Sequence, residues 1–308
     1  MIKLSIIVPF YNVESYIENC VRSLYNQDIP IDEYEVICVD DCSLDSSRSI
    51  IENLQKEYQS LKLVCHERNK KLGAARNTGL KVARGKYIWF VDSDDFIYPN
   101  ILSSLMNYVL TNNLDILQFD HHRELLSLNK QPQESDVTNG EMFLFDKTVM
   151  NWYDKVCGAW KQWFKRSFII ENNLQFIEES LYEDTDYLLL AFLSAQRVQY
   201  VSIVAYHYRI NLESITLSQM SPVKIAWRIN QIIRCSQLIS HATTLEAQEN
   251  IKILVTSNLS QLRSELKKFS YKEKRVYLKN LTSDVIMCKN LISWRTWLAI
   301  RYCIVCFI

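Results

Sequence analysis

The first hundred residues alternate between short apolar runs and stretches with helical periodicity. Four runs have the length of buried strands: "LSIIV" (residues 4–8), "EVICV" (35–39), "LKLVC" (61–65) and "YIWFV" (87–91). Between them, apolar residues recur every three or four positions, which predicts helices near residues 17–24, 45–58 and 73–83. Strands that alternate with helices at this spacing favour a mostly parallel sheet flanked by helices, so the predicted fold class is α/β.

Polar segments follow each of the four predicted strands. In open parallel sheets, ligands bind beyond the carboxyl ends of the strands. The segments at those ends are residues 9–12, 40–41, 69–76 and 92–95. A parallel sheet would bring them to one edge, which is therefore the candidate site.

The segment "DSDD" (residues 92–95) places three carboxylates at the end of an apolar strand. Asp92 and Asp94 lie two positions apart, so both face one side of an extended chain. Their oxygens suit Mg²⁺ or Mn²⁺ shared with substrate phosphates. The alternative is a solvated, Asp-rich turn. Because like charges this close raise one another's pKa, we expect a cation beside them.

The sequence has only five glycines and contains neither of the glycine-rich nucleotide-binding motifs. Bound phosphates would then be held by metal and arginine, for which Arg76 is the local candidate; the alternative is a surface ion pair. Tyr11 could stack on a nucleobase or pack half-buried. Asp41 could accept hydrogen bonds from a base or ribose, or cap the following helix.

Charge and cysteine content narrow the function classes. Lys+Arg and Asp+Glu both number 35, and no basic run is interleaved with aromatic residues, which argues against nucleic-acid binding. The nine cysteines are scattered, and the N-terminus leads into a strand without a signal-peptide pattern. We therefore expect reduced thiols and a cytoplasmic location.

Three longer segments stand in order along the first part of the chain: "SIIVPFYNVESYIENCVRSLYNQ" (residues 5–27), "EVICVDDCSLDSS" (35–47) and "NKKLGAARNTGLKVARGKYIWFVDSDD" (69–95). Together they resemble the family-two glycosyltransferases of the GT-A fold, of the bacterial cell-surface polysaccharide type. Further on, "FIEESLYEDTDYLL" (176–189) and "YHYRINLESIT" (206–216) are similar to the family's acceptor-side and closing segments. The resemblance covers about the first 216 residues.

The resemblance implies roles for particular side chains at the predicted edge. Pro9, Tyr11, Asp41 and Arg76 would hold the nucleobase and the ribose or phosphate of a nucleotide-sugar. Asp92 would contact the ribose or the metal shell, and Asp94 would coordinate the Mn²⁺ or Mg²⁺ ion that bridges the diphosphate. Arg209 and Ser214 would close over the diphosphate.

Other implied roles lie further along the chain. Asp184 would be the general base, and Glu183, Asp95 and Trp160 would shape the sugar and acceptor pocket. His207 could complete the metal shell, although a histidine packed in the core is the favoured interpretation. Gln162 stands where many relatives have lysine, which weakens the case for a donor contact from this stretch.

The resemblance implies an inverting transfer of one sugar from a nucleotide-diphosphate sugar to a saccharide or lipid-linked acceptor. A UDP-sugar is the first choice of donor, and GDP and dTDP donors stay open. Two alternatives are a non-catalytic nucleotide-sugar-binding relative and a sugar-1-phosphate nucleotidyltransferase. The nucleotidyltransferase would show a glycine-rich, arginine-containing loop after the first strand, where this chain has "PFYNVE" (residues 9–14).

The predicted domains are a GT-A catalytic domain over residues 1–215 and a helical region over 216–308. Within the catalytic domain, residues 1–95 form the nucleotide-binding half and 96–215 the acceptor half. The apolar tail "LISWRTWLAIRYCIVCFI" (residues 291–308) carries tryptophan and arginine. It could lie at a membrane interface, bringing the enzyme to the inner face of the cell membrane. Equally, it could pack on the protein or on a second copy in a homo-oligomer.

Overall fold

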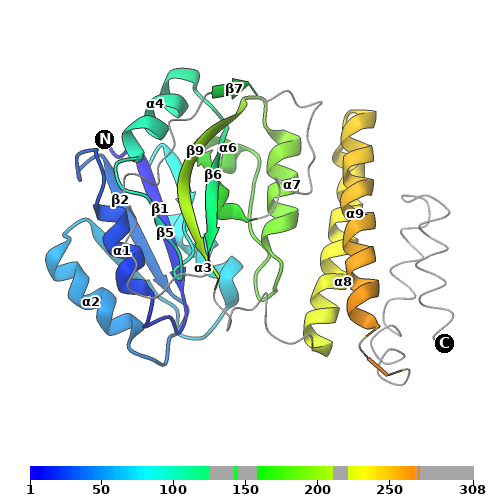
Figure 1. Ribbon diagram of the computed structural model, residues 1–308, viewed down its shortest axis with the longest axis horizontal. Coiled ribbons are helices and arrows are strands. Elements are labelled where there is room, and N and C mark those ends of the chain that lie inside the picture. Colours follow the sequence, from blue (N-terminus) through cyan, green and yellow to red (C-terminus); the bar gives the residue numbers. More distant parts are fainter. Residues whose placement is uncertain (125–141, 145–157, 211–220, 268, 271–308) are drawn as a thin grey trace. The chain divides into compact units, whose positions relative to one another are not determined.

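The computed structural model describes residues 1–124, 142–144, 158–210, 221–267 and 269–270 (Figure 1). The described residues group into two compact units. The first unit holds those within 1–144, 158–180 and 194–210, and the second holds 181–193 and those from 221 onward. Ser214 and the apolar tail lie outside the described residues. The domain boundary at residue 215 stays a prediction.

The first unit contains a parallel half-sheet with the order β3-β2-β1-β4. Its strands are β1 (Leu4–Phe10), β2 (Tyr34–Asp40), β3 (Leu61–Cys65) and β4 (Tyr87–Phe90). The intervening helices are α1 (Ile17–Tyr25), α2 (Ser47–Glu57) and α3 (Lys71–Val82). Every residue of β1, β2 and β4 is buried, as expected for parallel strands covered on both faces. The predicted strands and helices of the first hundred residues are therefore confirmed.

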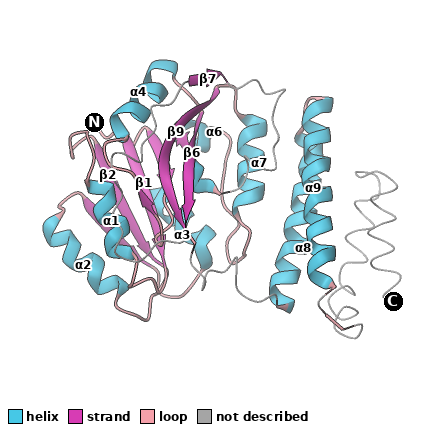
Figure 2. Cartoon of the chain, viewed as in Figure 1, coloured by secondary structure: helices cyan, strands magenta, loops and turns pink. Residues whose placement is uncertain are grey.

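Beyond β4 the sheet becomes mixed (Figure 2). Strand β8 (Gln162–Lys165) runs antiparallel to both β4 and β6 (Ile116–Glu124). The other strands are β9 (Val198–Arg209), parallel to β6, and β5 (Phe96–Ile97) and β7 (Met142–Leu144), both antiparallel to β9. Among its described residues, the unit also contains α4 (Leu102–Asn112), the 3₁₀ turn Ala159–Lys161 and α6 (Arg166–Glu171). The prediction of a mostly parallel sheet thus describes the first half better than the second.

Helices α1 and α3 cover opposite faces of the sheet. Ile6 packs in one buried cluster with residues of α1, whereas the neighbouring Ile7 faces α3. A Cβ added to Gly79 of α3 would lie 2.3 Å from Ile7 Cγ2. Glycine at this position therefore lets α3 approach the sheet closely, which fixes the place of the loop before it.

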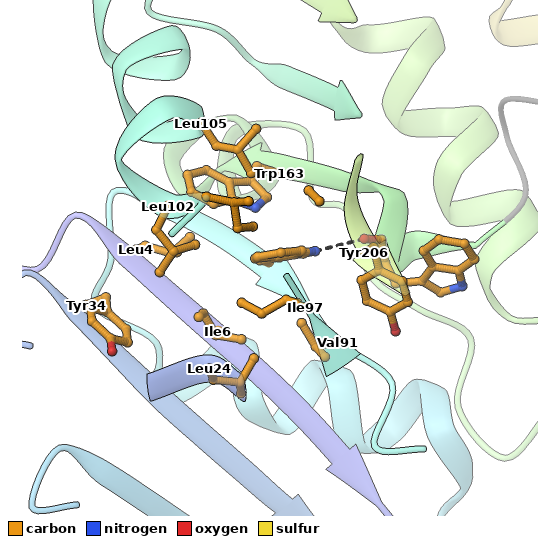
Figure 3. Packing of buried hydrophobic residues seen from close by; sticks show 14 of the residues in the cluster. Leu4, Ile6, Leu24, Tyr34, Val91, Ile97, Leu102, Leu105, Trp163 and Tyr206 are labelled. Atoms are coloured by element: carbon orange, nitrogen blue, oxygen red, sulfur yellow. Dashed lines mark hydrogen bonds between the residues drawn. The ribbon is translucent and has the colours of Figure 1, made fainter. Parts of the chain in front are cut away.

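The core cluster on the α1 face joins the two halves of the sheet (Figure 3). Trp89 of β4 and Trp163 of β8 are fully buried, with ring centres 5.5 Å apart. The indole N–H of Trp89 donates to the Trp160 carbonyl at 2.8 Å, so the buried ring has its polar partner. These large rings therefore pack β4 against β8, at the junction of the two halves of the sheet.

The second unit is helical where the structure describes it. It contains α7 (Asp184–Ser194, of which residue 194 groups with the first unit), α8 (Pro222–Gln237), a 3₁₀ turn (Leu238–His241) and α9 (Leu245–Leu266). Ser221 caps α8 and Thr244 caps α9, each accepting a backbone N–H three residues on. Within the described residues, no helix combines the length and apolar character needed to span a bilayer.

Candidate active site

The loops that follow β1 and β2 hold each other through a reciprocal set of hydrogen bonds. Asn12 Oδ1 accepts from the Leu44 N–H at 2.8 Å, and Glu14 Oε2 accepts from the Ser46 N–H at 2.8 Å. In the other direction, Asp45 Oδ2 accepts from the Glu14 N–H at 3.0 Å. We call this contact the loop clasp. Tyr11 precedes the first of these residues and is 41% exposed, so a ligand or solvent can reach it.

Pro9 lies near the end of β1, buried and opposite Val39 of β2. The pairing of β1 with β4 ends at Ile7, two residues earlier. Proline lacks an N–H, so it suits a strand position beyond the ladder. Pro9 therefore lies near the carboxyl edge, where β1 has passed its pairing with β4 and still pairs with β2.

Asp41 caps a helix, but not the one that follows it in sequence. Its two carboxylate oxygens accept the Lys70 and Lys71 N–H groups at the start of α3, both at 2.8 Å. Its Oδ1 also lies 2.7 Å from His66 Nδ1, and His66 Nε2 lies 2.8 Å from Thr78 Oγ1. His66 could not be predicted from the sequence, because a lone histidine after a strand belongs to no recognisable pattern. Asp41 and His66 together tie the end of β2 to α3.

Arg76 supplies the cation that the acidic segment requires. Its Nη2 donates to Asp92 Oδ1 at 2.8 Å, and its guanidinium carbon lies 5.1 Å from the Phe176 ring centre. Arg76 is 2% exposed, so it is not the surface ion pair that the sequence left open. Arg76 therefore compensates the charge of Asp92 and orients its carboxylate.

The three carboxylates after β4 have different environments. Asp95 is 1% exposed; it accepts the Tyr206 hydroxyl at 2.7 Å and the Arg209 N–H at 2.7 Å. Burial, and then the charges of Asp94 and Asp92, raise the pKa of Asp95 well above its usual value. Asp92 and Asp94 are only partly buried. Asp95 therefore ties the acidic segment to β9, and Asp92 and Asp94 are the more exposed carboxylates. A role for Asp95 in the sugar and acceptor pocket stays a prediction.

Asp92 and Asp94 fit a divalent cation that is shared with a substrate. In the part of the chain that the structure describes, no group of three or more His, Cys, Asp or Glu side chains is arranged to hold a metal. Magnesium commonly takes only one or two carboxylates and completes its shell with waters and phosphate oxygens. The donor set therefore suits an ion that binds together with a diphosphate.

His207 lies in the packed position favoured from the sequence. Its ring stacks on Phe96, with centres 4.5 Å apart and planes at 8°, and it is 2% exposed. Its Nδ1 lies 3.1 Å from the Tyr98 hydroxyl, which also lies 2.9 Å from His122 Nδ1. The described residues do not group His207 with Asp92 and Asp94 as a metal site.

Arg209 is a buried guanidinium with no hydrogen-bond partner among the described residues. It ends β9 and is 3% exposed, and none of its three side-chain nitrogens is hydrogen bonded there. Its guanidinium carbon lies 5.1 Å from the Tyr16 ring centre and 5.5 Å from that of Phe96. Two aromatic faces thus hold a desolvated cation beside the acidic edge. Such a group is ready to bind an anion.

Trp160 stacks in a ladder of aromatic rings on β9. Its ring centre lies 4.4 Å from that of Tyr206 and 5.5 Å from that of Tyr208. Lys161 Nζ lies 5.1 Å from the Trp160 ring, and Gln162, next along the chain, is fully buried in β8. The ladder connects Asp95, through the Tyr206 hydroxyl, to Trp160.

Asp184 is the first residue of α7 and belongs to the second unit. Thr185 Oγ1 donates to Asp184 Oδ1 at 3.5 Å. Glu183 is 5% exposed, and Asp186 is paired with Arg234 at 2.6 Å. The "YEDTD" stretch is therefore more than a solvated helix start, because two of its three carboxylates are buried.

Comparison with known proteins supports one family. The model of the family "Glycosyl transferase family 2" matches residues 5–175, more than half of the chain. The chain is 31% identical over 259 residues to a poly(ribitol-phosphate) beta-glucosyltransferase of Bacillus spizizenii. That alignment covers 82% of this chain and 39% of the relative, so the chain spans well under half of that protein's length.

Two solved structures share the fold. A crystal structure of S. aureus TarS 1-349 in complex with UDP-GlcNAc superposes with a TM-score of 0.77 at 23% identity, covering 98% of this chain and 87% of that one. The mannosyltransferase PcManGT from Pyrobaculum calidifontis, in complex with GDP-Man and Mn²⁺, has a TM-score of 0.55 at 17% identity, covering 99% and 85%. These likenesses confirm the predicted α/β fold of the GT-A type. With its sequence motifs, its mixed sheet and the family match over residues 5–175, the chain belongs to glycosyltransferase family 2.

Proposed function

We propose that the protein is a metal-dependent, inverting glycosyltransferase that uses a UDP-sugar. The observation that carries the proposal is the arrangement at the carboxyl edge of the sheet. Two partly buried carboxylates, Asp92 and Asp94, stand with the buried cations Arg76 and Arg209, and Arg209 has no hydrogen-bond partner among the described residues. A diphosphate held through a divalent ion complements both signs of charge.

The donor would lie along the edge formed by the loops after β1, β2 and β3. The exposed Tyr11 ring offers a stacking face for the base, next to Pro9. The carboxylate of Asp41 is already occupied by the start of α3, so its contact with the base or ribose would use its remaining acceptor capacity. The UDP-GlcNAc in the TarS crystal structure supports the choice of nucleotide.

Mn²⁺ or Mg²⁺ would be held by Asp94, with Asp92 in its shell. The Mn²⁺ in the PcManGT complex supports the choice of a divalent ion. When bound, the ion would offset the negative charge that develops on the leaving diphosphate. Arg209 and Ser214 would add positive charge and a hydrogen bond to the same phosphates.

Asp184 would act as the general base. It accepts the proton of the acceptor hydroxyl while that oxygen bonds to the anomeric carbon and the bond from this carbon to the diphosphate breaks. One in-line displacement inverts the configuration and needs no covalent sugar–enzyme intermediate. Proton transfer of this kind contributes about 10²–10⁴-fold, and holding the two substrates in line contributes much of the rest.

The acceptor would be a saccharide or polyol hydroxyl of a cell-surface polymer. The poly(ribitol-phosphate) named in the Bacillus spizizenii relative supports this class. We propose that the reaction takes place in the cytoplasm, where a lipid-linked acceptor would be reached at the inner face of the membrane. The apolar tail, residues 291–308, is the segment proposed for that contact or for a homo-oligomer.

The test combines donor binding and turnover. Calorimetry should show UDP binding that tightens with Mn²⁺, and Asp94→Asn should abolish that dependence. Asp184→Asn should lower transfer to a ribitol-phosphate or saccharide acceptor by at least about 10²-fold while UDP affinity stays unchanged. UDP binding without turnover of any UDP-sugar would favour the non-catalytic alternative. Formation of UDP-sugar from UTP and a sugar-1-phosphate would favour the nucleotidyltransferase.

A further inference from the structure

Helix α8 makes polar contacts with the segment that carries Asp184. Gln231 Nε2 donates to Thr185 Oγ1 at 2.6 Å, and Arg234 Nε donates to Asp186 Oδ2 at 2.6 Å. Gln231 is 3% exposed and Asp186 is 8% exposed. Both contacts therefore lie inside the packed part of the second unit and hold the residues on the C-terminal side of Asp184.

A third contact reaches the N-terminal side of the same segment. The Arg228 guanidinium carbon lies 4.4 Å from the centre of the Tyr182 ring. Arg228, Gln231 and Arg234 follow one another at intervals of three residues, so they project from one face of α8. One helix face thus holds positions 182, 185 and 186 around the candidate base.

We propose that α8 positions the catalytic base, with Gln231 acting through Thr185 and Arg234 acting through Asp186. The inference rests on the proposed function, because it requires that Asp184 accept the proton of the acceptor. Beyond that function, it names the residues that orient the base. Gln231 and Arg234 are positioning residues and are not assigned contacts with substrate.

Thr185 accepts a hydrogen bond from Gln231 and donates one to Asp184. A glutamine Nε2 can only donate, so the Thr185 oxygen accepts from Gln231. The single hydroxyl proton of Thr185 is then donated to Asp184 Oδ1, at 3.5 Å. Gln231 therefore fixes the rotation of the Thr185 hydroxyl, whose proton then points toward the Asp184 carboxylate.

Arg234 acts through charge. Asp186 lies two residues from Asp184, and an uncompensated carboxylate there would disfavour the ionised form of the base. Arg234 neutralises it at 2.6 Å, while the N-terminus of α7 also favours negative charge. Other charged or titratable side chains near this segment are Glu183 and, on α7 and α8, Tyr187, Lys224, Arg228 and Cys235. Glu265 of α9 pairs with Arg228 at 3.2 Å and also acts on Lys224.

Helix α8 lies outside the part of the chain that defines the family. The family model matches residues 5–175, whereas α8 spans Pro222–Gln237. The helical region that the motifs leave unexplained would thereby acquire a role in catalysis. It would hold the acceptor-side acid–base group.

The experiment uses the full chain with a UDP-sugar and a ribitol-phosphate or saccharide acceptor. Gln231→Leu should lower kcat about 10- to 100-fold with an unchanged Kd for UDP, because only the orientation of the base is lost. Arg234→Met should move the acid limb of the kcat/KM profile to higher pH, and Arg234→Lys should restore it. Asn230→Leu and Arg263→Met change exposed residues of α8 and α9 and are the matched controls.

Thr185→Val is the second variant, because it removes the hydroxyl at nearly constant volume. If Gln231→Leu fails to fold, Thr185→Val should still show the kcat loss. Folded variants of Gln231 and Thr185 with kcat within twofold of the parent, or an unmoved acid limb in Arg234→Met, would overturn the proposal.

Hydrogen exchange separates this inference from the proposed function. Gln231→Leu should speed exchange of the amides at the start of α7 at least about tenfold, whether or not the protein transfers sugar. Faster exchange in a protein that transfers no sugar would refute the proposed function and leave the structural role of α8. Unchanged exchange in an active enzyme would refute the role of α8 alone.

Discussion

Arg76→Met should destabilise the protein because it removes the positive charge that is paired with Asp92. Removing one partner of a buried ion pair costs about 3–5 kcal/mol, since the other charge stays desolvated. Arg76 is 2% exposed, but the Asp92 side chain keeps 22% of its surface in water, which screens part of that cost. We therefore expect a loss of about 2–4 kcal/mol in the free energy of unfolding, with methionine keeping most of the aliphatic packing.

A double-mutant cycle isolates the pair. Asp92→Asn keeps a hydrogen-bond acceptor and should cost about 1–2 kcal/mol. The double variant should lose less than the sum of the two, with a coupling of about 1–3 kcal/mol. Urea unfolding followed by near-ultraviolet circular dichroism would report the environment of Trp89 and Trp163, which are fully buried in the first unit.

The matched control is Arg68→Met, which breaks an exposed pair with Glu179. These side chains are 69% and 57% exposed, so the loss should stay below about 1 kcal/mol. If the Arg76 and Asp92 losses instead add to within about 0.5 kcal/mol, the two groups are independent. A cation other than Arg76 would then have to compensate the negative charge of residues 92–95.

Two further predictions concern the opposite end of the sheet. Burial alone would raise the pKa of Glu35, but hydrogen bonds from Lys62, Ser5 and the Arg84 N–H outweigh burial and lower that pKa. The ionised Glu35 therefore stabilises the fold at neutral pH, and this stabilisation is lost as the pH falls through the lowered pKa. Glu35→Gln should therefore shift the urea midpoint at pH 7 by an amount equivalent to about 1–3 kcal/mol and by much less at pH 3, and equal shifts would contradict this reasoning. Gly85→Ala should destabilise more than Gly79→Ala, because its new Cβ would lie 2.4 Å from the Ser5 backbone nitrogen and would displace the strand itself. The Cβ added at Gly79 would meet side-chain atoms of Ile7, the nearest at 2.3 Å, and leaves the strand backbone in place. Thermal unfolding of the two variants ranks them.

The parallel half of the sheet was predictable because its strands are buried on both faces and read as continuous apolar runs. The acidic edge was predictable because parallel strands have their carboxyl ends at one edge of the sheet, so the loops that follow them lie close together. The rest depends on contacts between distant segments. Arg209 packs against Tyr16 and Phe96, which lie far from it in sequence, so no local sequence pattern predicts these contacts.

The same limit applies to the helical region and to the antiparallel strands. Residues 222–237 show helical periodicity, but periodicity does not say which segment the polar face of a helix will meet. Gln231 gave no signal as a partner of Thr185, because an amide inside a helix is usually solvated. Strand β5 has only two residues, too few for any alternating pattern to emerge.

The loop clasp has a consequence for changing which nucleotide such an enzyme accepts. Each of its two loops completes the hydrogen bonds of the other, so neither keeps its shape when exchanged alone. Nucleotide preference should therefore pass between relatives only when residues 11–14 and 43–47 are grafted together, as one inherited unit.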